Sequence, residues 1–465
     1  MASILVRGGT LVTLDRRRRI IKDGAVAIED NKIVAVGKRE EVTRQYPSAG
    51  EIVEASGKLV LPGLVDSHVH HTQMLARGIA DDLDLITWIH DRILPYESVM
   101  TDEDTYTSAM LCCLEMIKTG TTTTVDPGGY RMEHVARALD ESGMRGIVAW
   151  ASMDTDTPDR PVPRNLLTTT EGALKANLEL IKAVHKTADG RIRARAGIRI
   201  EPNASSTLIK EIDKLAKKHG VGVEMHAAVS REQVDVIKKR TGLSMIRYLK
   251  SLGVLGPHWL LIHMGWIDDE EVEILKATDT RIAHVPGASM KGAYGSARYG
   301  KFPELLRAGV IVGLGCDSSA ANNSLDMFRA MWQVASVHKE VRYDPHLVSP
   351  EEAIEMATIK AAKAVLWDEE IGSIEVGKKA DVIIVDVNRS NWMPLHDFSI
   401  VPNMVYAGDG HDVNTVIVDG KVLMKERRVL TMDEEDVLSK SQKTAERLID
   451  RAGLDAKLKP AWPVT

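Results

Sequence analysis

Apolar positions along most of the chain recur in short runs that are separated by amphipathic stretches. From about residue 61 to residue 367 these runs return every thirty to forty residues, a spacing typical of parallel βα units. Eight of the runs predict strands, and eight is the number of strands in a closed (β/α)8 barrel. The predicted strands cover residues 63–68, 122–126, 145–151, 195–200, 222–226, 259–263, 281–284 and 310–316.

A second pattern, of short β-rich runs separated by turn residues, occupies both ends of the chain. It covers residues 3–6, 10–14, 24–29, 32–37, 379–386 and a hairpin over 413–422. Neither end alone has enough strands for an independent sandwich, so we predict that both ends fold together as one small β-sandwich.

The expected fold class is therefore α/β, a (β/α)8 TIM-like barrel with a small β-sandwich built from both termini. We assign residues 1–60 and 368–430 to the discontinuous sandwich and residues 61–367 to the barrel. Residues 431–465 are expected to form a C-terminal helix and tail, because residues 434–452 are charged and amphipathic.

Composition restricts the classes of protein that fit. The 465 residues include 60 Lys and Arg against 66 Asp and Glu, for a net charge of −6, which argues against a nucleic-acid partner. Three cysteines cannot form a disulfide framework. The first seven residues are too short and too charged for a signal peptide, and no 18-residue uncharged apolar run is present. We expect a cytoplasmic enzyme with a small-molecule substrate and no membrane contact.

Histidine and aspartate gather at the ends of the predicted strands. His68 and His70 follow the first strand, His226 and His263 end the fifth and sixth, and Asp317 follows the eighth. In a barrel these ends meet at one mouth, and residues at i and i+2 of an extended chain face the same side. A single histidine is usually structural, but the coincidence at four strand ends indicates a metal site. Imidazole and carboxylate suit Zn²⁺, with Co²⁺, Fe²⁺ or Mn²⁺ as alternatives.

Six motifs spread over nearly the whole chain carry a resemblance to a known family. They are LPGLVDSHVH at residues 61–70, GTTTT at 120–124, GVLGP at 253–257, HVP at 284–286, GLGCDS at 313–318 and GSIEVGKKAD at 372–381. With these motifs the chain resembles the amidohydrolase superfamily, in the branch of cytosine and guanine deaminases, adenosylhomocysteine-type deaminases and triazine chlorohydrolases.

The resemblance implies one metal ion held by His68, His70, His226 and Asp317, with His263 beside the reacting water. It also implies that Asp317 acts as the general base and that the protein is a homo-oligomer. The binuclear branches place a lysine at the end of the fourth strand, where this chain has Glu201. One metal is therefore expected, with recruitment of a second by Glu201 as the alternative.

Several positions depart from the pattern of the deaminase branch. Val229 stands where that branch has a glutamate that moves a proton to the ring nitrogen, and Glu232 follows three residues later. Asn203 and Trp266 replace histidines, and Met290 replaces an asparagine. Each change removes a polar group that would recognise or protonate a nitrogen heterocycle.

These departures favour hydrolysis of an amide-type C–N bond in a small neutral, xenobiotic substrate. A urea, carbamate, thiocarbamate or amide fits, and the phenylurea and thiocarbamate (molinate) hydrolases share this branch. The candidate substrate-binding residues are Trp88, Asn203, Trp266 and Met290.

The alternative is deamination or dechlorination of a purine, pterin or triazine, with Glu232 or a water chain in place of the absent glutamate. A non-catalytic scaffold is a third reading, disfavoured because all five site positions are intact. The glycine-rich residues 292–300 are expected to form a mobile active-site loop.

Overall fold

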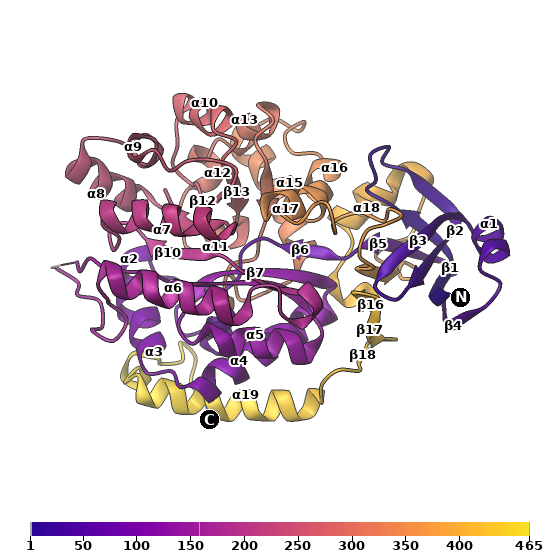
Figure 1. The fold of residues 1–465 in the computed structure, drawn as a ribbon, viewed down its shortest axis with the longest axis horizontal. Coiled ribbons are helices and arrows are strands. Elements are labelled where there is room, and N and C mark those ends of the chain that lie inside the picture. Colours follow the sequence, from indigo (N-terminus) through magenta and orange to yellow (C-terminus); the bar gives the residue numbers. More distant parts are fainter. Residues whose placement is uncertain (1, 158, 465) are drawn as a thin grey trace.

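The computed structural model describes residues 2–157 and 159–464, and its parallel strands form a barrel (Figure 1). Each predicted barrel strand is present, although the fourth is divided in two. The strands are β6 (Leu64–Asp66), β7 (Thr121–Gly129), β8 (Arg145–Trp150), β9 (Ile192–Ala194) with β10 (Ala196–Ile200), β11 (Val223–Ala227), β12 (Trp259–His263), β13 (Arg281–His284) and β14 (Val312–Leu314).

Hydrogen bonds across two seams close these strands into a ring. Ser67 N donates to Leu314 O at 3.0 Å, which joins the first strand to the eighth. At the divided fourth strand, Arg199 N donates to Ser152 O at 3.1 Å. The strands are buried on both faces, as expected for a parallel sheet covered by helices. The predicted TIM-like barrel is confirmed.

Helices surround the barrel, and each buries its apolar stripe on the strands beneath it. They are α4 (Asp102–Lys118), α5 (Met132–Ser142), α6 (Thr170–Val184), α7 (Ser206–His219), α8 (Arg231–Thr241), α9 (Met245–Leu252), α10 (Asp269–Ala277), α13 (Phe302–Arg307), α15 (Met327–Arg342), α16 (Pro350–Met356) and α17 (Ile359–Ala364). Shorter helices lie in the loops at the mouth: α2 (Leu85–Trp88), α3 (Leu94–Ser98), α11 (Pro286–Lys291), α12 (Ser296–Tyr299) and α14 (Ser319–Asn322).

The two chain ends share one nine-stranded sheet beside the barrel. Its strands are β1 (Ala2–Val12), β2 (Ile20–Glu29), β3 (Lys32–Lys38), β4 (Ala49–Glu54), β5 (Lys58–Pro62), β15 (Val382–Asp386), β16 (Val413–Val418), β17 (Lys421–Lys425) and β18 (Arg428–Val429). Antiparallel pairing of β5 with β15 joins the N-terminal half to the C-terminal half. Residues 3–6 and 10–14, expected as separate strands, belong largely to β1, because Gly8 adopts a φ of +83° and lets the strand continue through a bulge.

One arginine joins the terminal sheet to the barrel. Arg145, the first residue of β8, is fully buried, and its guanidinium contacts Asp381 Oδ2 at 2.8 Å and Asp419 Oδ1 at 2.9 Å. The two aspartates lie just before β15 and just after β16. This ion cluster therefore couples the two parts of the fold.

The predicted C-terminal helix is α19 (Glu434–Arg451), which packs against α4 along one side of the barrel (Figure 1). Lys118 Nζ contacts Glu434 Oε1 at 2.7 Å, and Arg451 contacts Asp104 at 2.5 Å, so both ends of the helix are held. Two further helices lie beside the terminal sheet, α1 (Arg39–Gln45) and α18 (Ile400–Tyr406). Among the described residues, none of the helices has the length and apolar character needed to cross a bilayer.

Candidate active site

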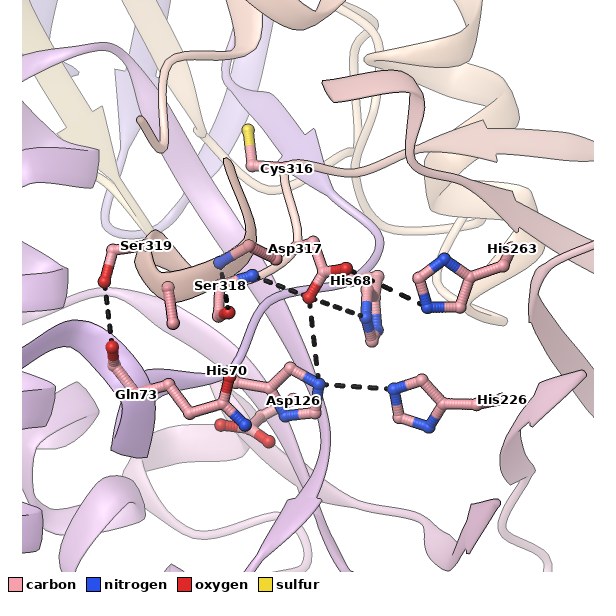
Figure 2. Close-up of polar contacts among 12 residues, drawn as sticks. His68, His70, Gln73, Asp126, His226, His263, Cys316, Asp317, Ser318 and Ser319 are labelled. Atoms are coloured by element: carbon pink, nitrogen blue, oxygen red, sulfur yellow. Dashed lines mark hydrogen bonds and ion pairs between the residues drawn. The ribbon is translucent and has the colours of Figure 1, made fainter. Parts of the chain in front are cut away.

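The barrel brings together five side chains that are far apart in the sequence. His68 and His70 lie just after β6, His226 lies in β11, His263 ends β12, and Asp317 lies just after β14. These positions are all at the carboxyl ends of the strands, where parallel barrels build their sites. Figure 2 shows the four imidazoles and the carboxylate facing one another across the mouth.

Ligand-type atoms converge within a few ångströms. His70 Nε2 lies 3.2 Å from His226 Nε2. Asp317 Oδ1 lies 3.5 Å from His68 Nε2 and 3.9 Å from His70 Nε2, and Asp317 Oδ2 lies 3.8 Å from His263 Nε2. All five side chains are at most 7% exposed. A surface salt bridge does not require four buried imidazoles around one carboxylate, so an ordinary ion pair does not account for this cluster.

The protonation state of these histidines fits a divalent cation. Burial lowers the pKa of His70 and His226 well below the ordinary range, so both are neutral at pH 7. His226 Nδ1 donates to the Arg199 carbonyl at 2.6 Å, which leaves the lone pair of its Nε2 directed at His70. Both ring nitrogens of His68 are buried without a hydrogen-bond partner. Unsatisfied imidazole lone pairs around a carboxylate form a donor set suited to Zn²⁺ or a similar ion.

Asp317 remains ionised in this environment. Burial alone would raise its pKa, but interactions with His68 and His263 and the backbone hydrogen bond from Ser318 N hold the pKa below its usual value. Asp66 Oδ1 accepts from the backbone N of both His68 and Cys316, at 3.0 and 3.2 Å. Since Asp317 N also donates to His68 O at 2.8 Å, the two ligand-bearing segments are fixed to each other.

The backbone is strained at two of the five residues. His263 has a φ of +77° and Asp317 a φ of +64°, both in the left-handed region that non-glycine residues rarely adopt. Such conformations cost roughly 1–3 kcal/mol each and concentrate at functional sites. Backbone hydrogen bonds fix the chain at both places: Met264 N donates to Ala227 O at 3.0 Å, and Asp317 N donates to His68 O at 2.8 Å.

The cluster lies in a small cavity with a largely apolar wall. Its polar lining consists of His70, Arg199, His226, His263, Tyr294 and Asp317, and its apolar lining of Leu85, Trp88, Ile89, Ile200, Val229 and Ala321. The guanidinium of Arg199 contacts the Gly128 carbonyl at 3.4 Å and Glu97 at 3.2 Å. The guanidinium of Arg199 is thus already engaged with the protein.

The predicted substrate-binding residues are distributed over several surfaces. Trp88 lines the cavity, and its indole donates to the Ala320 carbonyl at 3.4 Å. Asn203 is buried in an adjoining side groove, where it donates to Thr155 O and Thr157 Oγ1. Trp266 lines an outer groove above the cavity. Met290 is 47% exposed and lines a separate groove with Trp332.

Neither of two further candidate carboxylates lies in the metal cavity: Glu232, the proposed substitute for the missing glutamate, and Glu201, the alternative ligand for a second metal. Glu232 is exposed on the first turn of α8 and lines the outer and side grooves. Glu201 is fully buried, but its Oε1 is paired with Arg240 at 2.5 Å and it belongs to the side groove. Val229, which lines the cavity, is 1% exposed. The cavity therefore contains one carboxylate, that of Asp317, among its described lining residues.

Sequence reasoning missed most of the wall. Leu85, Ile89 and Ala321 gave no signal because they lie in short helical turns at the barrel mouth, where no apolar period shows which residues face the cavity. Ile200 gave none because it resembles any other apolar residue of a buried strand. Tyr294 lies within the glycine-rich segment expected to form a loop at the site, and that segment does border the cavity.

The chain is similar over nearly its full length to proteins that are named as deaminases. It is 37% identical to a 5-methylthioadenosine/S-adenosylhomocysteine deaminase of Pelotomaculum thermopropionicum, over 97% of this chain and 100% of the relative. It is 35% identical to a 5'-deoxyadenosine deaminase of Methanosarcina acetivorans, over the same shares.

The expected urea, carbamate or amide substrate is therefore wrong, and so is the narrower resemblance to phenylurea and thiocarbamate hydrolases. That expectation relied on polar residues missing from the motifs, such as the glutamate replaced by Val229. Relatives at this level of identity are named for deamination of an adenosine-like heterocycle, which was the alternative. Missing side chains exclude one arrangement of proton donors, but they do not exclude the reaction.

The fold and the family agree with these relatives. An adenosine deaminase from Xanthomonas campestris with bound zinc matches with a TM-score of 0.90 and 25% identity, over 97% of this chain and 99% of that one. A triazine hydrolase variant shares the fold with a TM-score of 0.88. The model of the amidohydrolase family matches residues 59–423. The chain belongs to the amidohydrolase family and is a metal-dependent hydrolase that acts on carbon–nitrogen bonds.

Proposed function

We propose that this enzyme hydrolytically removes the amino group from an adenosine-like nucleoside, with one zinc ion at the barrel mouth. The proposal is carried by one combination: the five-residue cluster in a closed cavity, on a chain 35–37% identical over 97% of its length to nucleoside deaminases. His68, His70, His226 and Asp317 would hold the ion. When bound, such an ion acidifies water enough to supply a nucleophile near neutral pH.

Asp317 is suited to move protons during the reaction. Its carboxylate is ionised and lies within 4 Å of three imidazoles. It would take a proton from the attacking water and return it to the heterocycle. His263, whose pKa burial lowers to about 4, is neutral and able to hydrogen-bond the attacking oxygen.

A panel of amino-heterocycles tests this proposal. We expect the metal-replete enzyme to release one ammonia per 5'-deoxyadenosine, 5'-methylthioadenosine or adenosine consumed, with formation of the 6-oxo product. Chelator-treated enzyme should lose this activity, and added Zn²⁺ or Co²⁺ should restore it. Absence of ammonia release from every 6-aminopurine nucleoside by enzyme with a full metal complement would refute the proposal.

Restoring the missing carboxylate should increase the deamination rate. We expect Val229→Glu to raise kcat on the best nucleoside about 10²-fold, the lower end of what general acid catalysis contributes. The apolar surroundings of position 229 would raise the pKa of the new carboxyl group and keep it able to donate a proton. Val229→Gln, with the same shape and no acid, is the matched control and should not accelerate the reaction. Equal rates for the two variants would contradict this prediction.

A further inference from the structure

The wall opposite the metal cluster contains one residue whose polar group is not engaged. Val229 packs in a small buried group with Leu85, Ile200 and Tyr294. Among these four, Tyr294 alone carries a polar side-chain atom. Tyr294 therefore belongs to the same small buried group as the position at which this chain lacks a carboxylate.

Tyr294 is close to the reacting groups. Its ring centroid is 6.4 Å from that of His263, with the two rings nearly perpendicular. The residue is 6% exposed and lines the metal cavity as well as the outer groove above it. No hydrogen bond joins its hydroxyl to any group of the described residues, whereas the Arg199 guanidinium beside it in the wall is already bonded. This hydroxyl is therefore free to bond a molecule that occupies the cavity or the outer groove beside it.

The loop holds the phenol at this place by its backbone. Tyr294 N donates to Ser289 O at 3.0 Å, and the indole of Trp266 donates to Tyr294 O at 2.6 Å. The ring also lies against Gly292, where a Cβ would be 2.4 Å from the Cζ of Tyr294. Gly292 therefore permits the present position of the ring. Trp266, predicted to be a pocket wall, lines the outer groove and also anchors Tyr294.

We propose that Tyr294 is a catalytic residue whose hydroxyl donates a hydrogen bond to the ring nitrogen beside the attacked carbon of the heterocycle. This inference rests on the proposed function. Val229 has no polar side-chain atom that could stabilise the ring nitrogen, and we assign this role to Tyr294. Preorganised donors of this kind stabilise charge that develops during the reaction.

The reaction balances without net proton loss from the phenol. The oxygen of water forms a bond to the amino-bearing carbon, and the π electrons of the C=N bond move to the ring nitrogen. While negative charge develops on that nitrogen, the Tyr294 hydroxyl donates its hydrogen bond there. One proton of the water then reaches the nitrogen through Asp317, and the phenol oxygen accepts from the N–H that has formed. The second water proton moves to the amino group, the C–N bond breaks with its electron pair on ammonia, and the C=O bond forms.

The test compares variants of the metal-replete enzyme. We expect Tyr294→Phe to lower kcat on the best nucleoside about 10²-fold, the usual effect of deleting one such donor, with KM changed less than threefold and metal content unchanged. Gly292→Ala, which keeps the hydroxyl but displaces the ring, should also lower kcat. Tyr299→Phe is the matched control, since it removes a hydroxyl from the same loop at a ring that stacks on Trp266 outside the cavity. It should retain the wild-type kcat.

Rescue separates a chemical role from a packing role. The double variant Val229→Glu with Tyr294→Phe should have a kcat at least tenfold above that of Tyr294→Phe alone. The double variant Val229→Gln with Tyr294→Phe should show no such increase. A Tyr294→Phe kcat within twofold of wild type, or equal recovery with Glu and Gln, would overturn the inference. Fluorescence titration with purine riboside, which has no amino group to lose, gives a readout independent of turnover. It should show an affinity for Tyr294→Phe within threefold of wild type, because the proposed hydrogen bond strengthens as charge develops in the reaction. If the wild type releases no ammonia from the panel, the proposed function fails first and this inference with it.

Discussion

Replacement of Asp317 by asparagine is expected to reduce kcat/KM by at least about 10³-fold, since it removes the general base together with a charged ligand. The shape of the side chain is conserved, so the barrel should remain folded. Asparagine carries no negative charge and cannot take a proton from water. The neighbouring imidazoles would also face a neutral amide at the present distances of 3.5–3.9 Å.

Three measurements separate loss of chemistry from loss of fold. Ammonia release gives the rate, elemental analysis gives metal per chain, and circular dichroism gives the folded fraction. We expect lower metal content and lost activity with an unchanged spectrum. Asp235→Asn on the exposed surface of α8 is the control and should behave as wild type. Retention of more than a tenth of the activity by Asp317→Asn would contradict the assigned role.

The cluster could be predicted from sequence because the carboxyl ends of all the strands in a parallel barrel meet at one mouth. His226 and Asp317 are separated by 91 positions in the printed sequence, yet both follow apolar runs that can only be barrel strands. Their meeting point is dictated by topology rather than by local propensity. The same reasoning identified the shared sheet of the two chain ends, whose short strands need partners. Homo-oligomerisation stays a prediction, as does the native metal.

The substrate could not be predicted in the same way. Wall residues such as Leu85 and Tyr294 lie in loops, where no period fixes which way a side chain points. Met290 illustrates the difficulty, since it follows Ser289 in a family motif and yet its side chain lies in a groove apart from the cavity. The absence of the motif residues predicts a change of substrate only if no other loop supplies a hydrogen-bond donor, and a second loop can supply one from a different direction.

Replacement of Arg145 by methionine is expected to destabilise the protein by about 3–5 kcal/mol, the usual cost of removing one partner from a buried ion cluster. Methionine fills a similar volume but leaves the carboxylates of Asp381 and Asp419 buried together without their cation. Lys379 remains 3.5 Å from Asp419 and can compensate only in part. Equilibrium unfolding in urea, followed by tryptophan fluorescence, measures the change.

A matched control is available on the same face of the barrel. Arg191 is also buried, but its carboxylate partner Asp140 is 55% exposed. Arg191→Met should therefore cost no more than about 1–1.5 kcal/mol, because water can solvate the partner that remains. Similar losses for the two variants would show that burial of the partners does not set the cost.

The stability lost in Arg145→Met is expected to depend on pH, and the pKa of Asp419 determines in which direction. In the native protein burial raises the pKa of Asp419, but Arg145 outweighs it and holds the pKa below the ordinary value. That carboxylate therefore contributes stability above its unfolded pKa, which is lost as the pH falls. Without Arg145, burial is opposed only by the weaker interactions with Lys379 and Asn31, and we expect it to raise the folded pKa. Stability is then lost as the pH rises through that pKa. The difference in unfolding free energy between wild type and Arg145→Met should thus be larger at pH 8 than at pH 5. If this difference becomes smaller as the pH rises, a buried and uncompensated carboxylate is not its cause.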